Sequence, residues 1–154
     1  IDHMQTRIKK TDSIVNKMKS RGLDITYQNM IENINDIAGI RVICPLKKDV
    51  FSVRDLVRNI PGVRILKEKD YINNPKKSGY SSYHMILEVP ISLSNKHMYV
   101  KVEVQIRTMA MDFWASLEHK LKYKPQSEIT KASSKELVTC AKMVHKLDNK
   151  MMSF

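Results

Sequence analysis

The sequence predicts an α/β or α+β domain in which helices flank a mixed β-sheet of about five strands. Three observations favour this fold class. Helical and strand-like patterns alternate along the 154 residues, 42% of the residues are apolar, and no internal repeat, low-complexity tract or Gly/Ser linker interrupts the chain. We therefore expect residues 1–154 to form a single domain. Because the chain begins with Ile1 instead of methionine, we also expect N-terminal sequence to be missing.

The N-terminal part of the chain predicts helices around one strand. A first helix is expected to begin at Thr11 or Asp12, whose side chains can cap free N–H groups, and to end at Gly22. The elements expected next are a short helix over residues 27–33, a strand over 38–44 that Pro45 ends, and a helix from Asp49 to about Asn59.

Further strands are predicted over residues 63–67, 82–89 and 100–107. Ser94, Asn95 and Lys96 lie between the last two, which we expect to form an antiparallel hairpin with a longer loop. The last strand has the clearest alternation of apolar and polar residues. One face carries Val100, Val102, Val104 and Ile106, and the other carries Lys101, Glu103, Gln105 and Arg107.

Two helices complete the predicted fold. The first is expected to face the core with Met109, Phe113, Trp114, Leu117 and Leu121. The second begins with a capping-box pattern, Ser133 to Glu136. We expect this C-terminal helix, within residues 127–154, to be a contact between copies of the chain. Its apolar stripe consists of Leu137, Cys140, Ala141, Val144, Leu147 and Met151.

The charge balance indicates a polyanionic partner. Lys and Arg total 27 against 16 Asp and Glu, a net charge of +11. Such an excess fits nucleic acid, acidic lipid or nucleotide phosphates without choosing among them. The basic residues are spread over several elements and no apolar run is long enough to span a bilayer, so we expect no membrane partner. Cys44 and Cys140 form no CxxC pair, and without a secretory signal we expect a cytoplasmic protein.

The polar face of the strand over residues 100–107 is the first candidate site. It is either a solvated sheet face or the floor of a polar cleft in which Glu103 binds a metal or acts as a base, and the strand alone does not choose between them. The hairpin partner can bring His84 to the same face. Asp36 could join Glu103 in holding Mg²⁺, which prefers oxygen ligands. Taken alone, Asp36 fits a helix-ending turn better.

Residues 69–84 have the composition of a binding loop. The segment mixes lysines, a flexible glycine and tyrosines, which suits phosphate capture and base stacking. The alternative is a basic surface loop whose tyrosines cover the edge of the core. The sequence contains neither GxxxxGK[ST] nor GxGxxG, and its histidines and cysteines lack the spacing of a zinc site.

Four segments carry a resemblance to a known family. They are DIAGIR at 36–41, KDYI at 69–72, KKSGYSSYH at 76–84 and VEVQIRT at 102–108. In this order and with similar gaps, they closely resemble the synthetase domain of RelA/SpoT-type alarmone enzymes. The segment MDFWASLEH at 111–119 and the residue Ser78 resemble the small, single-domain branch of that family. The likeness extends from about Thr6 to Lys124.

The resemblance implies a nucleotidyltransferase-like fold that transfers pyrophosphate from ATP to the 3′-hydroxyl of GDP or GTP. It implies a Mg²⁺ cofactor held by Asp36 and Glu103, with Glu103 also the candidate base. Ser20 stands where close relatives carry a further arginine, with Arg21 adjacent. The implied ATP contacts are Arg7, Lys9, Ser13, Lys17 and Arg41. The implied acceptor contacts are Lys76, Ser78, Tyr80, His84 and Gln105.

Two functions from different classes follow. The first is a GTP pyrophosphokinase that makes ppGpp or pppGpp and does not degrade it, because the chain is too short for a hydrolase domain and lacks a clustered His-Asp pattern. The second is a regulatory module that binds single-stranded RNA through its basic surface, with weak or no synthetase activity. The resemblance also implies a homotetramer. The sequence does not decide between GDP and GTP as the acceptor.

Overall fold

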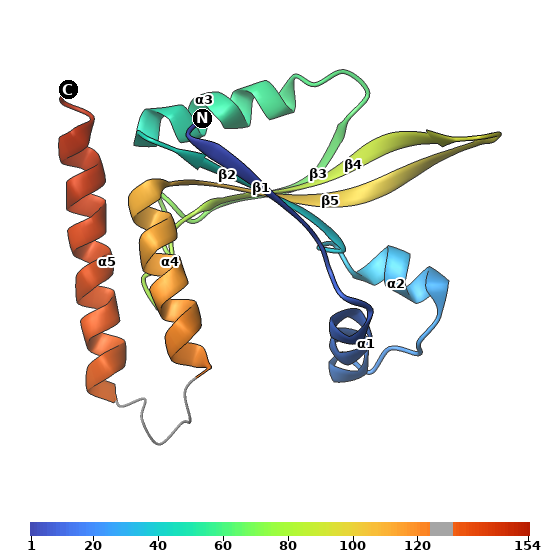
Figure 1. Ribbon diagram of the computed structural model, residues 1–154, viewed down its shortest axis with the longest axis horizontal. Coiled ribbons are helices and arrows are strands. Elements are labelled where there is room, and N and C mark those ends of the chain that lie inside the picture. Colours follow the sequence, from blue (N-terminus) through green and yellow to red (C-terminus); the bar gives the residue numbers. More distant parts are fainter. Residues whose placement is uncertain (124–130) are drawn as a thin grey trace.

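A computed structural model describes residues 1–123 and 131–154 and confirms the predicted fold class, because helices flank a mixed five-stranded sheet in this part of the chain (Figure 1). None of the described helices is both long and apolar enough to cross a bilayer. In chain order, the elements are β1 (His3–Ile8), α1 (Thr11–Ser20), α2 (Tyr27–Asn33), β2 (Ala38–Cys44), α3 (Lys47–Arg58), β3 (Arg64–Asp70), β4 (Tyr83–Leu93), β5 (Lys96–Thr108), α4 (Met109–Lys122) and α5 (Lys131–Met151).

The strands follow the order β1-β2-β5-β4-β3, in which β2 and β5 are parallel and every other pair is antiparallel. The hairpin of β4 and β5 is confirmed, but its loop is shorter than expected. Leu93 pairs with Lys96, so Ser94 and Asn95 alone make the turn, and Ser94 adopts a φ of 49°. Such a positive φ is what a tight two-residue hairpin turn requires.

The edge strand β1 has no counterpart among the predicted elements. Each of its residues is exposed, and only Met4 and Ile8 among them are apolar, which is too weak a pattern to predict a strand. The strand is held by its pairing with β2, in which Arg7 lies opposite Gly39 and Gln5 lies opposite Arg41. Backbone pairing therefore places Arg7 on the other side of Gly39 from Glu103, a position that no pattern of hydrophobic residues indicates.

The main core lies on one face of the sheet, under α3. Figure 1 shows α3 on that side, whereas α1 and α4 lie on the opposite side at the two ends of the sheet. The apolar residues of β2, β4 and β5 alternate onto the α3 face, as predicted for β5. Their polar neighbours therefore line the face between α1 and α4. The buried core comprises Val42, Cys44, Val50, Val53, Ile72, Tyr83, Met85, Leu87, Val104, Ile106 and Met111.

The first helix packs in a second, smaller cluster. Ile14 and Met18 of α1 are buried against Ile34, which follows α2. The expected side-chain cap is absent, because Lys10 occupies the N-cap position with extended backbone and no side-chain hydrogen bond, and Thr11 already lies within the helix. The cluster nevertheless fixes α1 beside the segment that contains Asp36.

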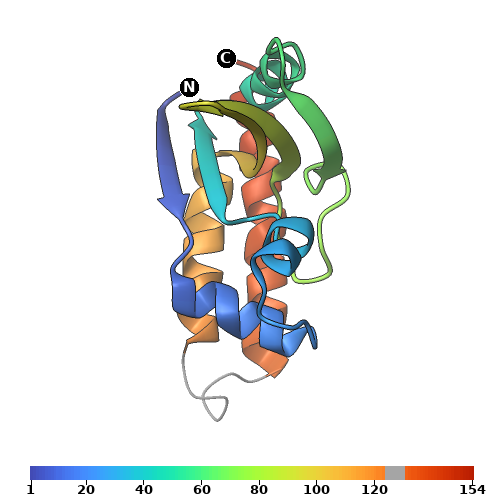
Figure 2. The ribbon, with the colours of Figure 1, turned by 90° about the vertical axis from the view of Figure 1, so that its right-hand side faces the viewer.

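The two C-terminal helices lie side by side (Figures 1 and 2), and the Trp114 indole donates a hydrogen bond to the Leu137 carbonyl at 2.9 Å. The predicted core spacing of α4 is partly wrong. Of the predicted core residues Trp114 is buried, but Met109, Phe113 and Leu117 are exposed, and the buried Met111 was not predicted. The predicted capping box is also wrong, because α5 already includes Lys131 and Ala132. Residues 127–130 of the predicted helical region lie outside the described residues.

Candidate active site

Two rows of side chains cross the polar face of the sheet between α1 and α4. In the first row, Gln5, Arg41, Gln105, His84 and Lys69 lie opposite one another on successive strands. In the second row, the residues that lie opposite one another across the strands are Arg7, Gly39, Glu103, Ile86 and Lys67. The parallel register of β2 and β5 puts Gly39 directly beside Glu103, and the missing side chain leaves open space next to the carboxylate.

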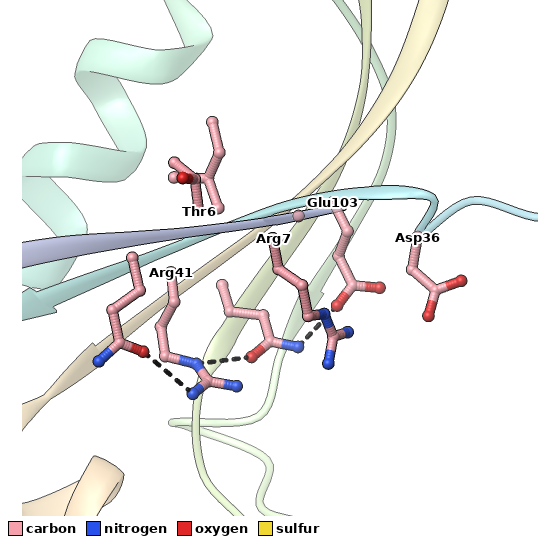
Figure 3. Close-up of a pocket in the computed structure, with 9 residues that line it drawn as sticks. Thr6, Arg7, Asp36, Arg41 and Glu103 are labelled. Carbon is pink, nitrogen blue, oxygen red and sulfur yellow. Dashed lines mark hydrogen bonds between the residues drawn. The ribbon is translucent and has the colours of Figure 1, made fainter. Parts of the chain in front are cut away.

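A cavity of about 380 Å³ opens over these rows (Figure 3). Its volume falls within the range of small-molecule sites. Asp36 lies just before β2 and Glu103 lies in the middle of β5, and Figure 3 shows their carboxylates directed into the same space. The other lining residues are Gln5, Thr6, Arg7, Gly39, Ile40, Arg41 and Gln105.

Asp36 is clamped by two ammonium groups. Lys17 of α1 donates to Asp36 Oδ1 at 2.9 Å, and Lys9 donates to Asp36 Oδ2 at 2.9 Å. Partial burial of the carboxyl group raises the pKa of Asp36, but the hydrogen bonds from Lys9 and Lys17 outweigh burial and hold the pKa below its ordinary value. Asp36 is therefore an anion at neutral pH, with two cations beside it that can also meet phosphates.

Glu103 is held by its neighbour two residues along β5. The Gln105 amide nitrogen donates to Glu103 Oε1 at 2.6 Å, while the Gln105 oxygen accepts from Arg41 Nε at 3.4 Å. The same strand that alternates apolar residues into the core thus presents Glu103 and Gln105 as a connected pair. Because Glu103 and Gln105 also line the cavity, the predicted cleft over the polar face of β5 is present, and the role of Glu103 there stays a prediction.

A second cluster gathers around Tyr80 and His84. The Tyr80 hydroxyl and His84 Nε2 are 2.7 Å apart, and the Tyr71 ring meets both residues edge-on. Lys76 lies with its ammonium 5.1 Å from the centre of the Tyr80 ring. Burial, followed by the positive charges of Arg107 and the nearby lysines, lowers the pKa of His84 to about 4.

Cavities join the two clusters. Asp36 and Glu103 also line a neighbouring cavity of about 200 Å³ with Tyr71 and His84. Arg7, Arg41 and Gln105 line another of about 560 Å³ with Tyr80 and residues of α4. The predicted site residues from β1, β2, β4 and β5 therefore border one continuous region of the polar face.

The serine positions stand apart from this region. Ser13 is exposed on α1 and does not line any of these cavities. Ser78 is exposed in the loop before β4, where its hydroxyl accepts a 3.4 Å hydrogen bond from the Tyr80 backbone N–H. Arg21, the neighbour of Ser20, lines the cavity with Lys17 and Asp36. The chain therefore has a positive side chain at this cavity although position 20 itself is a serine.

Sequence reasoning assigned no role to Arg107, which is 2% exposed and donates to both Tyr80 and Gln105. The signal that could have found it is its place on the polar face of β5, in line with Glu103 and Gln105.

The donor set fits a hard divalent cation. Two carboxylates border one cavity, and carboxylate oxygens are preferred ligands of Mg²⁺, which commonly binds one or two of them and takes its other ligands from water and substrate phosphates. Within residues 1–123 and 131–154, no group of three or more His, Cys, Asp or Glu side chains could hold an ion alone. A cation here would depend on phosphates for the remaining ligands.

The comparison with known proteins identifies the family. Residues 6–128 match the sequence profile described as the region found in RelA/SpoT proteins. The chain therefore belongs to the RelA/SpoT family.

Individual relatives agree with this assignment. The chain is 47% identical to the GTP pyrophosphokinase YwaC of Bacillus subtilis (strain 168), over 99% of this chain and 72% of the relative. The crystal structure of small alarmone synthetase 2 from Bacillus subtilis matches with a TM-score of 0.89 and 45% identity, over 99% of this chain and 79% of that one. Small alarmone synthetase 1 from the same organism, solved with its product pppGpp, matches with a TM-score of 0.88 and 30% identity, over 99% and 77% of the two chains.

Proposed function

We propose that this protein is a GTP pyrophosphokinase that transfers the pyrophosphate of ATP to the 3′-hydroxyl of GDP or GTP, with AMP as the second product. The observation that carries the proposal is the convergence of Asp36 and Glu103 on one cavity ringed by lysines and arginines. Two nucleotides bring many negative charges into one cleft, and transfer of a phosphoryl group depends mainly on positioning and charge neutralisation.

The ATP half of the site is assigned to β1, α1 and β2. Arg7 and Arg41 border the same cavity from neighbouring strands, and their planar guanidinium groups suit stacking on adenine. Lys9 and Lys17 would meet the phosphates, because both ammonium groups lie at Asp36, on the border of the cavity. Ser13 is the least supported member, because it is exposed away from the cavities.

The acceptor half is assigned to the loop before β4 and to β4 itself. Tyr80 offers an aromatic face for guanine, and stacking on a base is worth about 1–3 kcal/mol in proteins that bind single strands. Lys76 and Ser78 lie in the same loop, and His84 and Gln105 lie opposite each other on β4 and β5. This arrangement would direct the acceptor ribose toward Glu103.

The chemistry assigned to the site is an in-line displacement. The 3′-oxygen forms a bond to the β-phosphorus of ATP, the bond from that phosphorus to the α,β-bridging oxygen breaks, and AMP leaves. The proton of the 3′-hydroxyl passes to Glu103 Oε2, while Glu103 Oε1 accepts a hydrogen bond from the Gln105 amide nitrogen. Asp36 and Glu103 would hold Mg²⁺, which when bound would offset charge on the transferred phosphates.

The direct test is product formation. Labelled ATP incubated with GTP and Mg²⁺ should yield pppGpp, detected by thin-layer chromatography, and excess EDTA should abolish it. Glu103→Gln should lower the turnover number by about a hundredfold to ten-thousandfold, the usual contribution of a general base. Glu88→Gln is a matched control, because Glu88 pairs with Arg64 in the middle of β4 and does not line the cavities of the site. A wild-type protein that forms no product yet binds single-stranded RNA with a steep salt dependence would establish the RNA-binding alternative.

We also propose that the protein is a homotetramer whose contacts involve α4 and α5. The support is the apolar surface that these helices expose. Phe113 of α4 is 73% exposed and Met143 of α5 is 64% exposed, and both helices carry further exposed apolar side chains. Exposed apolar patches of this kind mark interaction sites.

A further inference from the structure

Arg107 is a buried cation at the end of β5, next to the proposed acceptor site. Its side chain is only 3% exposed. Burial of a charge costs several kcal/mol unless the charge is paired and hydrogen-bonded. One carboxylate compensates it, since Arg107 Nη1 lies 3.3 Å from Asp112 Oδ1. Arg107 Nε has no partner among the described residues. The arginine is therefore costly to keep as a purely structural residue.

The remaining donors of Arg107 are directed at the site. Nη2 donates to the Tyr80 hydroxyl at 3.2 Å and also to the Gln105 side-chain oxygen. A guanidinium can only donate hydrogen bonds. Tyr80 and Gln105 must therefore accept from Arg107. This determines whether each of them donates or accepts in its other hydrogen bonds.

Gln105 shows the first consequence. Because its oxygen accepts from Arg107 and Arg41, its amide nitrogen is left to face Glu103, to which it donates at 2.6 Å. The opposite amide orientation would direct N–H groups at two guanidinium groups and an oxygen at a carboxylate. Arg107 thereby keeps Glu103 supplied with a hydrogen-bond donor.

Tyr80 shows the second consequence. Its oxygen accepts from Arg107, so its own proton is available to His84 Nε2 at 2.7 Å. A neutral histidine that accepts at Nε2 carries its hydrogen on Nδ1. The lone pair of Nε2 is then occupied by the Tyr80 proton, so His84 does not act as the base, which leaves that role to Glu103.

We propose that Arg107 is a positioning residue for the acceptor half of the site, because its guanidinium orients the hydrogen bonds of Tyr80 and Gln105 and thereby fixes the tautomer of His84. This inference rests on the proposed function for its consequence in catalysis. The arrangement of His84 can be measured in the protein without nucleotide.

The first experiment is NMR of the full chain labelled with ¹⁵N-histidine. Wild-type His84 should be neutral at pH 7 with hydrogen on Nδ1. Arg107→Met should raise the pKa of His84 by about one unit or more, since a nearby positive charge is removed, and Tyr80→Phe should weaken the Nδ1–H preference. Val53→Ala, which removes core volume under α3, should leave the His84 signals unchanged. An Nε2–H tautomer in the wild type, or an unchanged His84 in Arg107→Met, would overturn the proposal.

The second experiment is kinetic, at saturating ATP. Arg107→Met should lower kcat/KM for GTP by about tenfold to a hundredfold, the range found for outer-shell partners of active-site groups. Arg107→Lys keeps the charge without the planar fork, so it should restore the low pKa of His84 but only part of the activity. If Val53→Ala loses as much activity as Arg107→Met, the role is structural. If the wild type makes no pppGpp, the proposed function fails while the NMR result still decides the hydrogen-bond arrangement.

Discussion

His84 illustrates how one residue takes its chemistry from its surroundings. Its ring is largely buried, and the positive groups that face it come from several elements: Arg107 of β5, Lys69 of β3, Arg41 of β2 and Lys76 of the loop before β4. Burial and these charges disfavour the imidazolium, so the pKa falls to about 4. His84 is therefore neutral across the physiological range.

This depressed pKa predicts a pH dependence of stability. Between about pH 4 and pH 6.5 the unfolded chain binds a proton at position 84 that the folded chain does not, so stability falls as pH decreases through this window. The contribution of His84 is up to about 3 kcal/mol. Urea unfolding at pH 7 and pH 5 should show a larger loss for the wild type than for His84→Gln. Equal losses in the two proteins would mean that His84 is readily protonated in the fold.

The loop before β4 and α5 form a contact that matters at the scale of elements. A Cβ atom at Gly79 would lie 2.6 Å from Ala141 Cβ and 3.2 Å from Trp114 Cζ2, and Gly79 has a φ of +99°. Only glycine combines this conformation with so close an approach. Helix α5 thus supports the loop that carries Lys76, Ser78 and Tyr80.

We predict that Gly79→Ala both destabilises the fold and weakens acceptor binding. Overpacking costs about 1–3 kcal/mol, in addition to about 1–2 kcal/mol for the left-handed backbone. Gly62→Ala is the matched control, because its φ is +79° but its nearest contact is 3.6 Å. Urea unfolding should separate the two variants by the overpacking alone, and the KM for GTP should rise only in Gly79→Ala. Addition of Ala141→Gly should recover part of the stability; no recovery would show that this contact does not matter.

At the scale of the whole molecule, the exposed apolar residues of α4 and α5 predict a self-association that a charge would break. Leu147→Asp on α5 should shift the proposed tetramer toward smaller species in size-exclusion chromatography with light scattering. Leu56→Asp on α3 is the matched control, since Leu56 is also exposed, and it should leave the mass unchanged. A monomeric wild type at micromolar concentration would contradict the prediction.

The proposed function also predicts that the reaction runs as synthesis alone. Asp36 and Glu103 line one cavity and would share a cation with nucleotide phosphates, which suits transfer between two nucleotides. We predict that the purified protein synthesises pppGpp and does not hydrolyse it. Loss of labelled pppGpp during incubation with Mg²⁺ or Mn²⁺, followed by chromatography, would count against this prediction.

Sequence reasoning succeeded where periodicity is strong. The alternation over residues 100–107 identified β5 and placed Glu103 and Gln105 on a face of their own, since the period of a strand leaves no other choice. It failed on β1, whose residues are all exposed, and on Phe113, which fits a core pattern but points outward. Periodicity records which residues share a face and does not record what covers that face.

By itself, the sequence determined the class of fold, the polar face of β5 and, through four ordered motifs, membership of the RelA/SpoT family. The tertiary structure decided which distant residues meet. Asp36 alone fitted a turn, and the parallel pairing of β2 with β5 brought it to Glu103. Arg107 meets the Tyr80 hydroxyl, which lies 27 residues away in sequence, only in the folded chain. Such encounters depend on the register between strands and on the packing of helices, which are set by contacts across the whole chain and not by any local pattern.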